Sequence, residues 1–384
     1  MKDIFTLSIR NVLILGIGNV INLETESRMY MLDTRILLIG ESNFDMYSSA
    51  FFKAWQKIGY QNITYFKTNE FLDSDERDGW LVKLWKRFER KTAVGNHVNI
   101  LNRKILENAA IIKPQLVFVY NSRFVFTQTL KKLKDNGAVI FLYSNDDPFS
   151  DFFPAYYWRH FQRGLSVTDV GFVYRVSNIG DFLDAGCKRV RQLRSYYIEE
   201  RNFKIGGLTS KQDDSPVVFL GHNENDERAE YIGELLKRGI KVGIIKKGWE
   251  DFEVDNPYLV KYENTGERYN ELINRAKIAL VFLSKINHDT YTRRCFEIPA
   301  TKTLMIAPFT EELASMFEEN KEIIFYRSKE ELAEKTEYYL RHDREREQIA
   351  NMGYERLMKD GHEITDRVRE VMAEYMELTN NHNK

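Results

Sequence analysis

Several features that mark particular protein classes are scarce in this chain of 384 residues. Only two cysteines are present, Cys187 and Cys295. They are too few for a disulfide framework or a cysteine-based zinc site, and they favour a reducing compartment, the cytoplasm. Neither charge prevails, because 56 Lys and Arg face 57 Asp and Glu, which leaves a net charge of −1. The chain therefore has no global positive field to attract nucleic acid or anionic lipid, although a local patch remains open.

Membrane-length hydrophobic runs are also missing. The apolar run at residues 12–23 (VLILGIGNVINL) is shorter than the roughly 20 residues that span a bilayer. No small-residue cleavage site follows it, so a buried strand or an upstream extension is favoured over a signal peptide. We assign residues 1–30 to an N-terminal extension or extra strand, and Met29 and Met31 stand just before a cleaner domain start.

What remains is a globular composition, with 43% hydrophobic residues, which excludes disorder and, at this length, predicts two domains. From residue 35, short apolar runs alternate with helical patterns. The predicted strands of the first half are 35–40, 62–66, 116–120, 138–144 and 170–174, with helices at 50–59 and 127–137. After a linker at 206–216, rich in Gly, Ser and Asp, the pattern restarts with strands at 216–221, 240–246, 276–284, 303–309 and 321–326 and a helix at 226–239.

Strands separated by helices form parallel sheets through right-handed crossovers. We therefore predict an α/β protein of two Rossmann-like domains, residues 31–205 and 217–370, followed by a C-terminal helix or tail at 371–384. Ligands of such sheets bind beyond the carboxyl ends of the strands, so the predicted site is the cleft between the domains.

The most informative segment is 287–309 (NHDTYTRRCFEIPATKTLMIAPF), which follows a predicted buried strand. Asp289 or Thr290 is a good N-cap, so we expect a helix to begin there. Arg293 and Glu297 are one helical turn apart. A plain intrahelical ion pair is one interpretation; the other is a nucleotide site, in which a carboxylate accepts the ribose hydroxyls while an arginine and the helix N-terminus face phosphates.

Two further loops follow predicted strands. Residues 221–228 (GHNENDER) begin with Gly221 and His222, and their backbone amides together with Arg228 could hold a phosphate; a capped helix entry with an exposed arginine is the simpler alternative. In the first half, Asp146 and Asp147 end a strand, where one carboxylate could accept the proton of an acceptor hydroxyl. An Asx-Pro turn explains the same residues equally well. Asp45 is a weaker candidate base.

The sequence gives little sign of a metal site. Asp73 and Asp75 form an Asp-x-Asp pattern, but it lies in a polar loop, and the seven histidines are scattered. We therefore expect no cofactor and no metal, with arginine, lysine and helix dipoles stabilising a leaving diphosphate.

A basic pattern occurs at residues 83–91, where Lys and Arg recur at helical spacing beside Leu84, Trp85 and Phe88. The simpler interpretation is a solvated basic face whose apolar side packs on the protein. The alternative is a helix that lies on an anionic membrane surface, and a clasp for an anionic acceptor is a third.

These segments resemble the CgeB-type (spore-maturation-like) glycosyltransferases, over about residues 35–371. The similarity is densest in VVFLGHNENDERAEYI (217–232), TYTRRCFEIPA (290–300) and the tail at 331–357, and looser in NHVNILNRKILENAAIIKPQLVFVY and LYSNDDPF. The resemblance implies the GT-B fold, with terminal helices that cross back over the first domain.

The resemblance also implies roles for residues of the second half. Glu297 matches the second acid of a Glu, seven residues, Glu signature and would contact the donor ribose, while Asp289, a shorter acid, stands at the first position. Lys302 replaces the glycine usual in the family, which we expect to alter the floor of the donor pocket. The predicted donor-binding residues are Gly221, His222, Arg228, Asp289, Thr292, Arg293, Arg294 and Glu297, with Asp146 and Asp147 as predicted catalytic residues.

The resemblance makes a cytoplasmic, metal-independent glycosyltransferase the first hypothesis, with a nucleotide-sugar donor, a UDP-sugar above all, in polysaccharide biosynthesis. The acceptor would be a glycan, a lipid-linked molecule or a protein, and the helix at 83–91 could add a peripheral contact with the inner membrane face. A degenerate GT-B module that binds nucleotide without turnover is the second hypothesis, motivated by Asp289 and Lys302. A nucleic-acid-directed transferase is the third, and the net charge argues against it.

Overall fold

The computed structural model describes residues 32–208, 214–224, 226–263 and 265–382. The apolar run at 12–23, the extension at 1–30 and residues 209–213 of the linker at 206–216 lie outside the described residues. The described chain forms two α/β domains, each built on a parallel sheet of six strands.

The first domain contains the elements β1 (Ile36–Gly40), α2 (Ser48–Lys57), β2 (Ile63–Lys67), α3 (Asn69–Leu72), α4 (Trp80–Thr92), α5 (Asn96–Ile112), β3 (Leu116–Tyr120), α6 (Thr127–Asp135), β4 (Val139–Ser144), α7 (Arg159–Gly164), the 3-10 turn η1 (Leu165–Val167), β5 (Val170–Val173), α8 (Asn178–Asp184) and β6 (Val190–Gln192). The strand order is β2-β1-β3-β4-β5-β6, and all the pairings are parallel.

The second domain contains β7 (Val217–Phe219), α9 (Arg228–Lys237), β8 (Val242–Ile245), β9 (Leu259–Tyr262), α10 (Thr265–Arg275), β10 (Ile278–Leu280), α11 (Arg294–Ala300), β11 (Leu304–Pro308), α12 (Glu311–Met316), β12 (Ile324–Tyr326), α13 (Lys329–Arg341) and α14 (Asp343–Asp360). Its sheet has the order β12-β11-β10-β7-β8-β9. The last helix is α15 (Ile364–His382).

The sequence predicted all the central strands correctly, together with the edge strands β2 and β12. All five residues of β1 and of β3 are buried, and a continuous apolar run is typical of a strand covered by helices on both faces. The sequence prediction missed the two edge strands β6 and β9. Each reads as a mixture of polar and apolar residues (VRQ and LVKY), because an edge strand is only partly covered.

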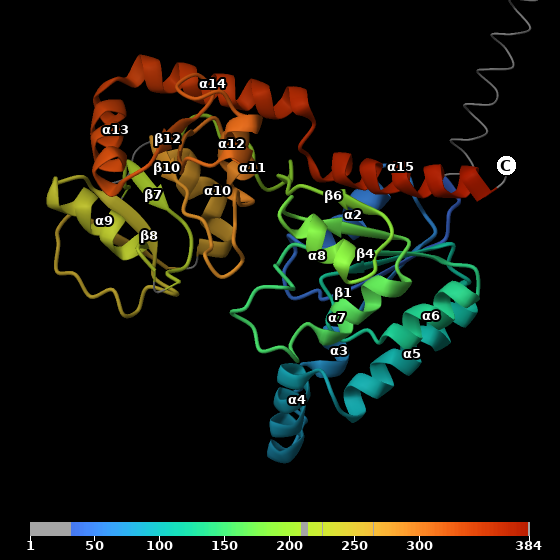
Figure 1. Ribbon diagram of the computed structural model, residues 1–384. Coiled ribbons are helices and arrows are strands. Elements are labelled where there is room, and N and C mark those ends of the chain that lie inside the picture. Colours follow the sequence, from blue (N-terminus) through green and yellow to red (C-terminus); the bar gives the residue numbers. More distant parts are fainter. Residues whose placement is uncertain (1–31, 209–213, 225, 264, 383–384) are drawn as a thin grey trace, which may run out of the picture.

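The C-terminal helices join the two domains. Figure 1 shows α14 running along the second domain and α15 lying over the first, next to α2. The turn between these helices is fixed by two backbone hydrogen bonds, from Tyr197 N to His362 O (3.1 Å) and from Ile364 N to Tyr197 O (3.1 Å). The tail therefore crosses back over the first domain, as the resemblance implies. None of the helices described here is long and apolar enough to cross a membrane.

Candidate functional site

The segment between β10 and α11 lies against the first domain, and α11 begins at Arg294 rather than at Asp289. The expected cap at Asp289 or Thr290 is wrong, because both side chains have other partners. The Asp289 carboxylate accepts from Arg175 Nε (2.7 Å), and Thr290 Oγ1 donates to Glu312 (2.5 Å). Thr292 Oγ1 instead accepts weakly from the Arg294 amide (3.4 Å). The loop is thus long enough to reach across to the other sheet.

Glu297 lies in the first turn of α11 and is only 6% exposed. One carboxylate oxygen lies 2.7 Å from Arg293 Nε, and the other accepts from the Tyr269 hydroxyl (2.8 Å). Each oxygen keeps a second lone pair, so the carboxylate is held in place and can still accept from a ligand hydroxyl. This is the pre-organised acceptor that a ribose diol requires.

Arg293 connects Glu297 with the first domain. Its guanidinium lies 5.2 Å from the ring centroid of Tyr47 and donates to Met46 O (3.4 Å), both in the loop after β1. Burial opposes the charge of this guanidinium, but Glu297 and the neighbouring tyrosines outweigh burial, so the pKa of Arg293 is raised above its usual value. The cation is therefore permanent and sits between the two domains.

Two arginines lie at the carboxyl edge of the second sheet: Arg228, at the start of α9, and Arg294, at the start of α11. Arg294 Nε and Nη2 donate to Leu220 O (3.2 Å each). Gly221 makes room for this side chain, because a Cβ at position 221 would lie 2.7 Å from Arg294 Nη2 and 2.5 Å from the Phe219 ring. A side chain at 221 would therefore displace the arginine.

Arg228 is 5% exposed and links two loops. It donates to His222 O and Leu283 O (2.8 Å each), and it pairs with the carboxylates of Glu224 (3.1 Å) and Asp226 (3.2 Å). The guanidinium lies where the sequence predicted it, at the end of β7, but with its own acids around it. Contact with a diphosphate requires the ligand to replace one of these carboxylates.

Across the cleft, Asp146 follows β4 and belongs to a polar cluster. Asn121 Nδ2 donates to Asp146 Oδ2 (2.9 Å), and Ser144 Oγ donates to Asn121 Oδ1 (2.7 Å). Burial raises the pKa of Asp146, and the hydrogen bond from Asn121 acts in the opposite direction. No cation of the described chain forms a salt bridge with Asp146, which fits a carboxylate that accepts a proton.

Asp147 has the features of a turn residue and a cleft residue at once. Its Oδ1 accepts from Phe149 N (2.9 Å), which is an Asx turn, and from Asn178 Nδ2 (2.9 Å). Its Oδ2 lies 2.9 Å from Nδ1 of His288 in the second domain. A carboxylate at this position orients the imidazole and favours the tautomer with hydrogen on Nδ1. The Asx turn is therefore confirmed, whereas the role of Asp147 toward an acceptor hydroxyl stays a prediction.

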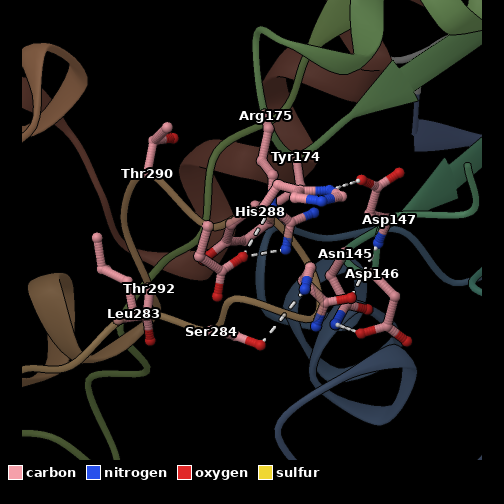
Figure 2. Close-up of polar contacts among 12 residues, drawn as sticks. Asn145, Asp146, Asp147, Tyr174, Arg175, Leu283, Ser284, His288, Thr290 and Thr292 are labelled. Carbon is pink, nitrogen blue, oxygen red and sulfur yellow. Dashed lines mark hydrogen bonds and ion pairs between the residues drawn. The ribbon is translucent and has the colours of Figure 1, made fainter. Parts of the chain in front are cut away.

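A buried ion pair joins the carboxyl edges of the two sheets, and its arginine, Arg175, is labelled in Figure 2. Arg175, which follows β5 and is 1% exposed, donates from Nε to Asp289 Oδ1 (2.7 Å). Burial lowers the pKa of Arg175, but Asp289 and the neighbouring tyrosines raise it by more. Beside the pair, the rings of Tyr174 and Tyr291 stack at 4.5 Å, and the Tyr291 hydroxyl donates to Tyr174 O (2.7 Å). Asp289 thus forms part of the domain contact.

The structure brings most of the predicted residues together near the contact between the two domains, and it adds residues that the sequence analysis missed: Asn121, Arg175, Tyr269 and His288. Asn121 and Arg175 each come just after a buried strand, a signal that could have found them. Tyr269 lies on α10, which the sequence analysis did not predict.

Three other candidates lie apart from this constellation. Asp73 is bound by Arg90 and Asp75 by Arg77 (2.8 Å), so both acids of the Asp-x-Asp pattern have cationic partners. Asp45 is exposed in the loop after β1. Within the described ranges, no three His, Cys, Asp or Glu side chains gather in a group that could hold a metal ion.

Lys302, expected at the floor of the donor pocket, lies against α14. Its Nζ lies 4.4 Å from the ring centroid of Tyr354 in α14, and its backbone has a φ of 56°. That left-handed conformation is the one glycine adopts freely. The replacement of glycine therefore places a residue with a left-handed backbone next to α14, and its effect on the floor of the donor pocket stays a prediction.

Comparisons with known proteins give a family match for the second domain and similar folds for nearly the whole chain. Residues 217–373 match the family described as glycosyl transferase-like. No curated protein sequence matches the chain. Among solved structures, a sucrose-phosphate synthase from Thermosynechococcus elongatus is 11% identical, with a TM-score of 0.67 over 91% of this chain and 100% of that one.

Two further structures are similar along almost their entire length. HepE from Anabaena, solved with UDP, has 11% identity and a TM-score of 0.59 over 90% of this chain and 100% of that one. A glycosyltransferase from Rickettsia africae has 11% identity and a TM-score of 0.61 over 91% and 99%. The chain therefore has the GT-B fold, and the family match of its second domain supports a glycosyltransferase activity.

Proposed function

We propose that this protein transfers a sugar from a nucleotide-sugar donor, a UDP-sugar above all, to a hydroxyl group of a glycan, a lipid-linked molecule or a protein. The observation that carries the proposal is the meeting of two chemically unlike sheet edges at the contact between the domains. Arginines and a fixed carboxylate face it from the second domain, and a carboxylate without a cationic partner faces it from the first. We also propose that the protein is a CgeB-type enzyme of the cytoplasm.

The donor residues follow from the contacts described above. Glu297, held by Arg293 and Tyr269, accepts the ribose hydroxyls. Arg294 and, after exchange of Glu224 or Asp226, Arg228 stabilise the charge that develops on the departing diphosphate. In this proposal the arginines replace a metal ion. HepE gives support, since its structures were solved with UDP and with UDP-glucose.

The acceptor residues lie on the first domain. Asp146 positions the acceptor hydroxyl and accepts its proton, while Asp147 acts with His288 at the point where the domains meet. Closure of the two domains excludes water, so that the sugar is transferred to the acceptor and is not hydrolysed from the donor.

Calorimetric titration of the full chain with UDP, GDP, CDP and ADP, each with and without EDTA, tests the proposal. We expect one diphosphate, UDP, to bind at micromolar affinity and EDTA to leave the affinity unchanged. A requirement for a divalent ion would overturn the metal-independent mechanism. Absence of binding by all four would overturn the donor site itself.

A degenerate GT-B module is the second candidate. The observation that favours it is the engagement of Asp289 by Arg175 and of Arg228 by two carboxylates, which leaves fewer free groups for a ligand. A module of this kind would bind the nucleotide and release no sugar with any acceptor, whereas the transferase releases UDP at a rate that depends on the acceptor.

A further inference from the structure

Helix α4 is turned the opposite way from an ordinary amphipathic surface helix. Two of its charged residues face the protein: Lys86 Nζ donates to Asp78 Oδ2 (2.8 Å) and to Asp73 O (3.1 Å), and the fully buried Glu89 accepts from His97 N (3.1 Å). The expectation that the apolar side of the helix packs on the protein is therefore wrong. The polar contacts with neighbouring loops decide the orientation of the helix.

The apolar side faces solvent instead. The outward residues are Trp80 (74% exposed), Leu81 (61%), Leu84 (58%), Trp85 (51%) and Phe88 (50%). At about 3.6 residues per turn these five side chains share one side of the helix. Two of them are in direct contact, since the rings of Trp85 and Phe88 stack at 5.4 Å. A cluster of large exposed apolar side chains marks an interaction site rather than a random surface.

The helix is firmly attached, so this exposure is not fraying of a loose end. Arg123 Nη1 donates to Lys91 O (3.2 Å), and Arg159 Nη2 donates to Thr92 O (2.9 Å). These cations satisfy carbonyl groups in the last turn of the helix, where positive charge is favourable. Figure 1 shows α4 projecting at one end of the first domain, held near its C-terminal end.

Cations border the apolar surface. Lys83, Arg87 and Lys91 are exposed, and Lys83 and Arg87, with Arg90, line an open hollow of about 640 Å³ next to the helix. We call the five apolar and three exposed basic residues of α4 the α4 face. It combines apolar side chains with a positive border, the composition of helices that lie in the interface of an anionic bilayer.

We propose that the α4 face docks the protein on an anionic lipid bilayer, with Trp80, Leu84 and Phe88 among the acyl chains and Lys83, Arg87 and Lys91 at the headgroups. An anionic bilayer can bind the apolar residues of the face in its acyl region and the basic residues at its headgroups. A second copy of the chain would cover the apolar side chains but bring two positive borders together, which is unfavourable. At 13 residues, α4 is too short to span the membrane and would lie in its plane.

The docking has a consequence that rests on the proposed function. Arg90 of α4 reaches Glu41 (3.5 Å), which follows β1 at the carboxyl edge of the first sheet. The helix is thus connected to the acceptor side of the cleft, and a docked α4 would bring that side close to a membrane-borne acceptor.

Sedimentation of the full chain with vesicles tests the docking. One set of vesicles contains phosphatidylcholine alone and the other equal parts of phosphatidylcholine and phosphatidylglycerol. We expect binding to the mixed vesicles, with a blue shift of tryptophan fluorescence, and at least a tenfold weaker partition for the variant Leu84→Glu, Trp85→Glu. Ile111→Glu is the matched control, because Ile111 is 83% exposed on α5 and should not change binding.

A second variant separates the two parts of the face. Lys83→Glu, Arg87→Glu should abolish the preference for anionic vesicles, at about 1 kcal/mol or a fivefold change per removed charge. Absence of vesicle binding by the unaltered protein overturns the proposal, as does equal binding by Leu84→Glu, Trp85→Glu. A dimer that this variant dissociates, without vesicle binding, shows a second copy as the partner instead. UDP binding, measured on the same samples, reports on the proposed function independently.

Discussion

The two sheets both contain six parallel strands, but their strand orders differ and they present different chemistry at their carboxyl edges. The first edge offers acids held by amides, with Asn121 on Asp146 and Asn178 on Asp147. The second offers arginines held by carbonyls and acids, with Arg294 on Leu220 O. An edge with acids suits a hydroxyl that must lose a proton, and an edge with arginines suits a diphosphate that gains charge. The shared fold brings the two edges to face each other, and the loops that follow the strands determine which one is acidic and which one carries arginines.

The largest expected effect concerns the ion pair that joins the two edges. Arg175→Met should lower the free energy of unfolding by about 3–5 kcal/mol, because it leaves the carboxylate of Asp289 buried without its partner. Urea denaturation measures the change.

A double variant sharpens this test. Arg175→Met with Asp289→Leu removes both charges, and its stability should return most of the way to that of the original protein. If the double variant is as unstable as the single one, the effect comes from lost packing and not from an unpaired charge.

The next effect breaks the acidic edge alone. Asp146→Asn should lower the transfer rate at least 100-fold, which is within the usual range for a general base, and leave UDP affinity unchanged. Because burial raises the pKa of Asp146, the rate of the unaltered enzyme should rise with pH through a value above the ordinary ~3.9, and the variant should lose this rise. The exposed Asp45→Asn is the control; a larger loss in the control would transfer the role to Asp45.

The third effect breaks the cationic edge. Glu297→Ala should weaken UDP binding at least tenfold, about 1.4 kcal/mol, through loss of a charge-assisted contact with the ribose. Calorimetry measures the affinity, and Glu334→Ala on the exposed side of α13 provides a matched control. Unchanged affinity in a folded Glu297→Ala variant would falsify the ribose assignment.

The smallest expected effect concerns Lys302 and tests whether this residue contributes to the donor site of the second domain. Lys302→Gly should raise the free energy of unfolding by no more than about 1 kcal/mol, since relief of the left-handed backbone is partly offset by loss of the contact with Tyr354. UDP affinity should stay the same. A marked change in affinity would return Lys302 to the donor pocket.

The sequence predicted the buried strands and the loops that follow them, because apolar runs and strand ends are local features. It placed Asp146 after β4 and Arg228 near the start of α9, but it began the helix of Glu297 at Asp289 or Thr290 instead of Arg294. It could not find the partners of these residues. Arg175 and Asp289 are more than a hundred positions apart in the chain, and only the packing of one domain on the other brings them to 2.7 Å.

Helix α4 shows most clearly where prediction from the sequence stops. Its sequence predicted a helix at residues 83–91 with a basic side and an apolar side, and the structure extends this helix to Trp80–Thr92. Which side faces the protein was decided by the tertiary structure, through the contacts of Lys86 with Asp78 and of Glu89 with His97. Helical periodicity is a property of one segment, whereas its orientation depends on partners that the rest of the fold supplies. For that reason the sequence alone specified two domains, two sheets and a cleft, and the tertiary structure decided which side chains meet in it.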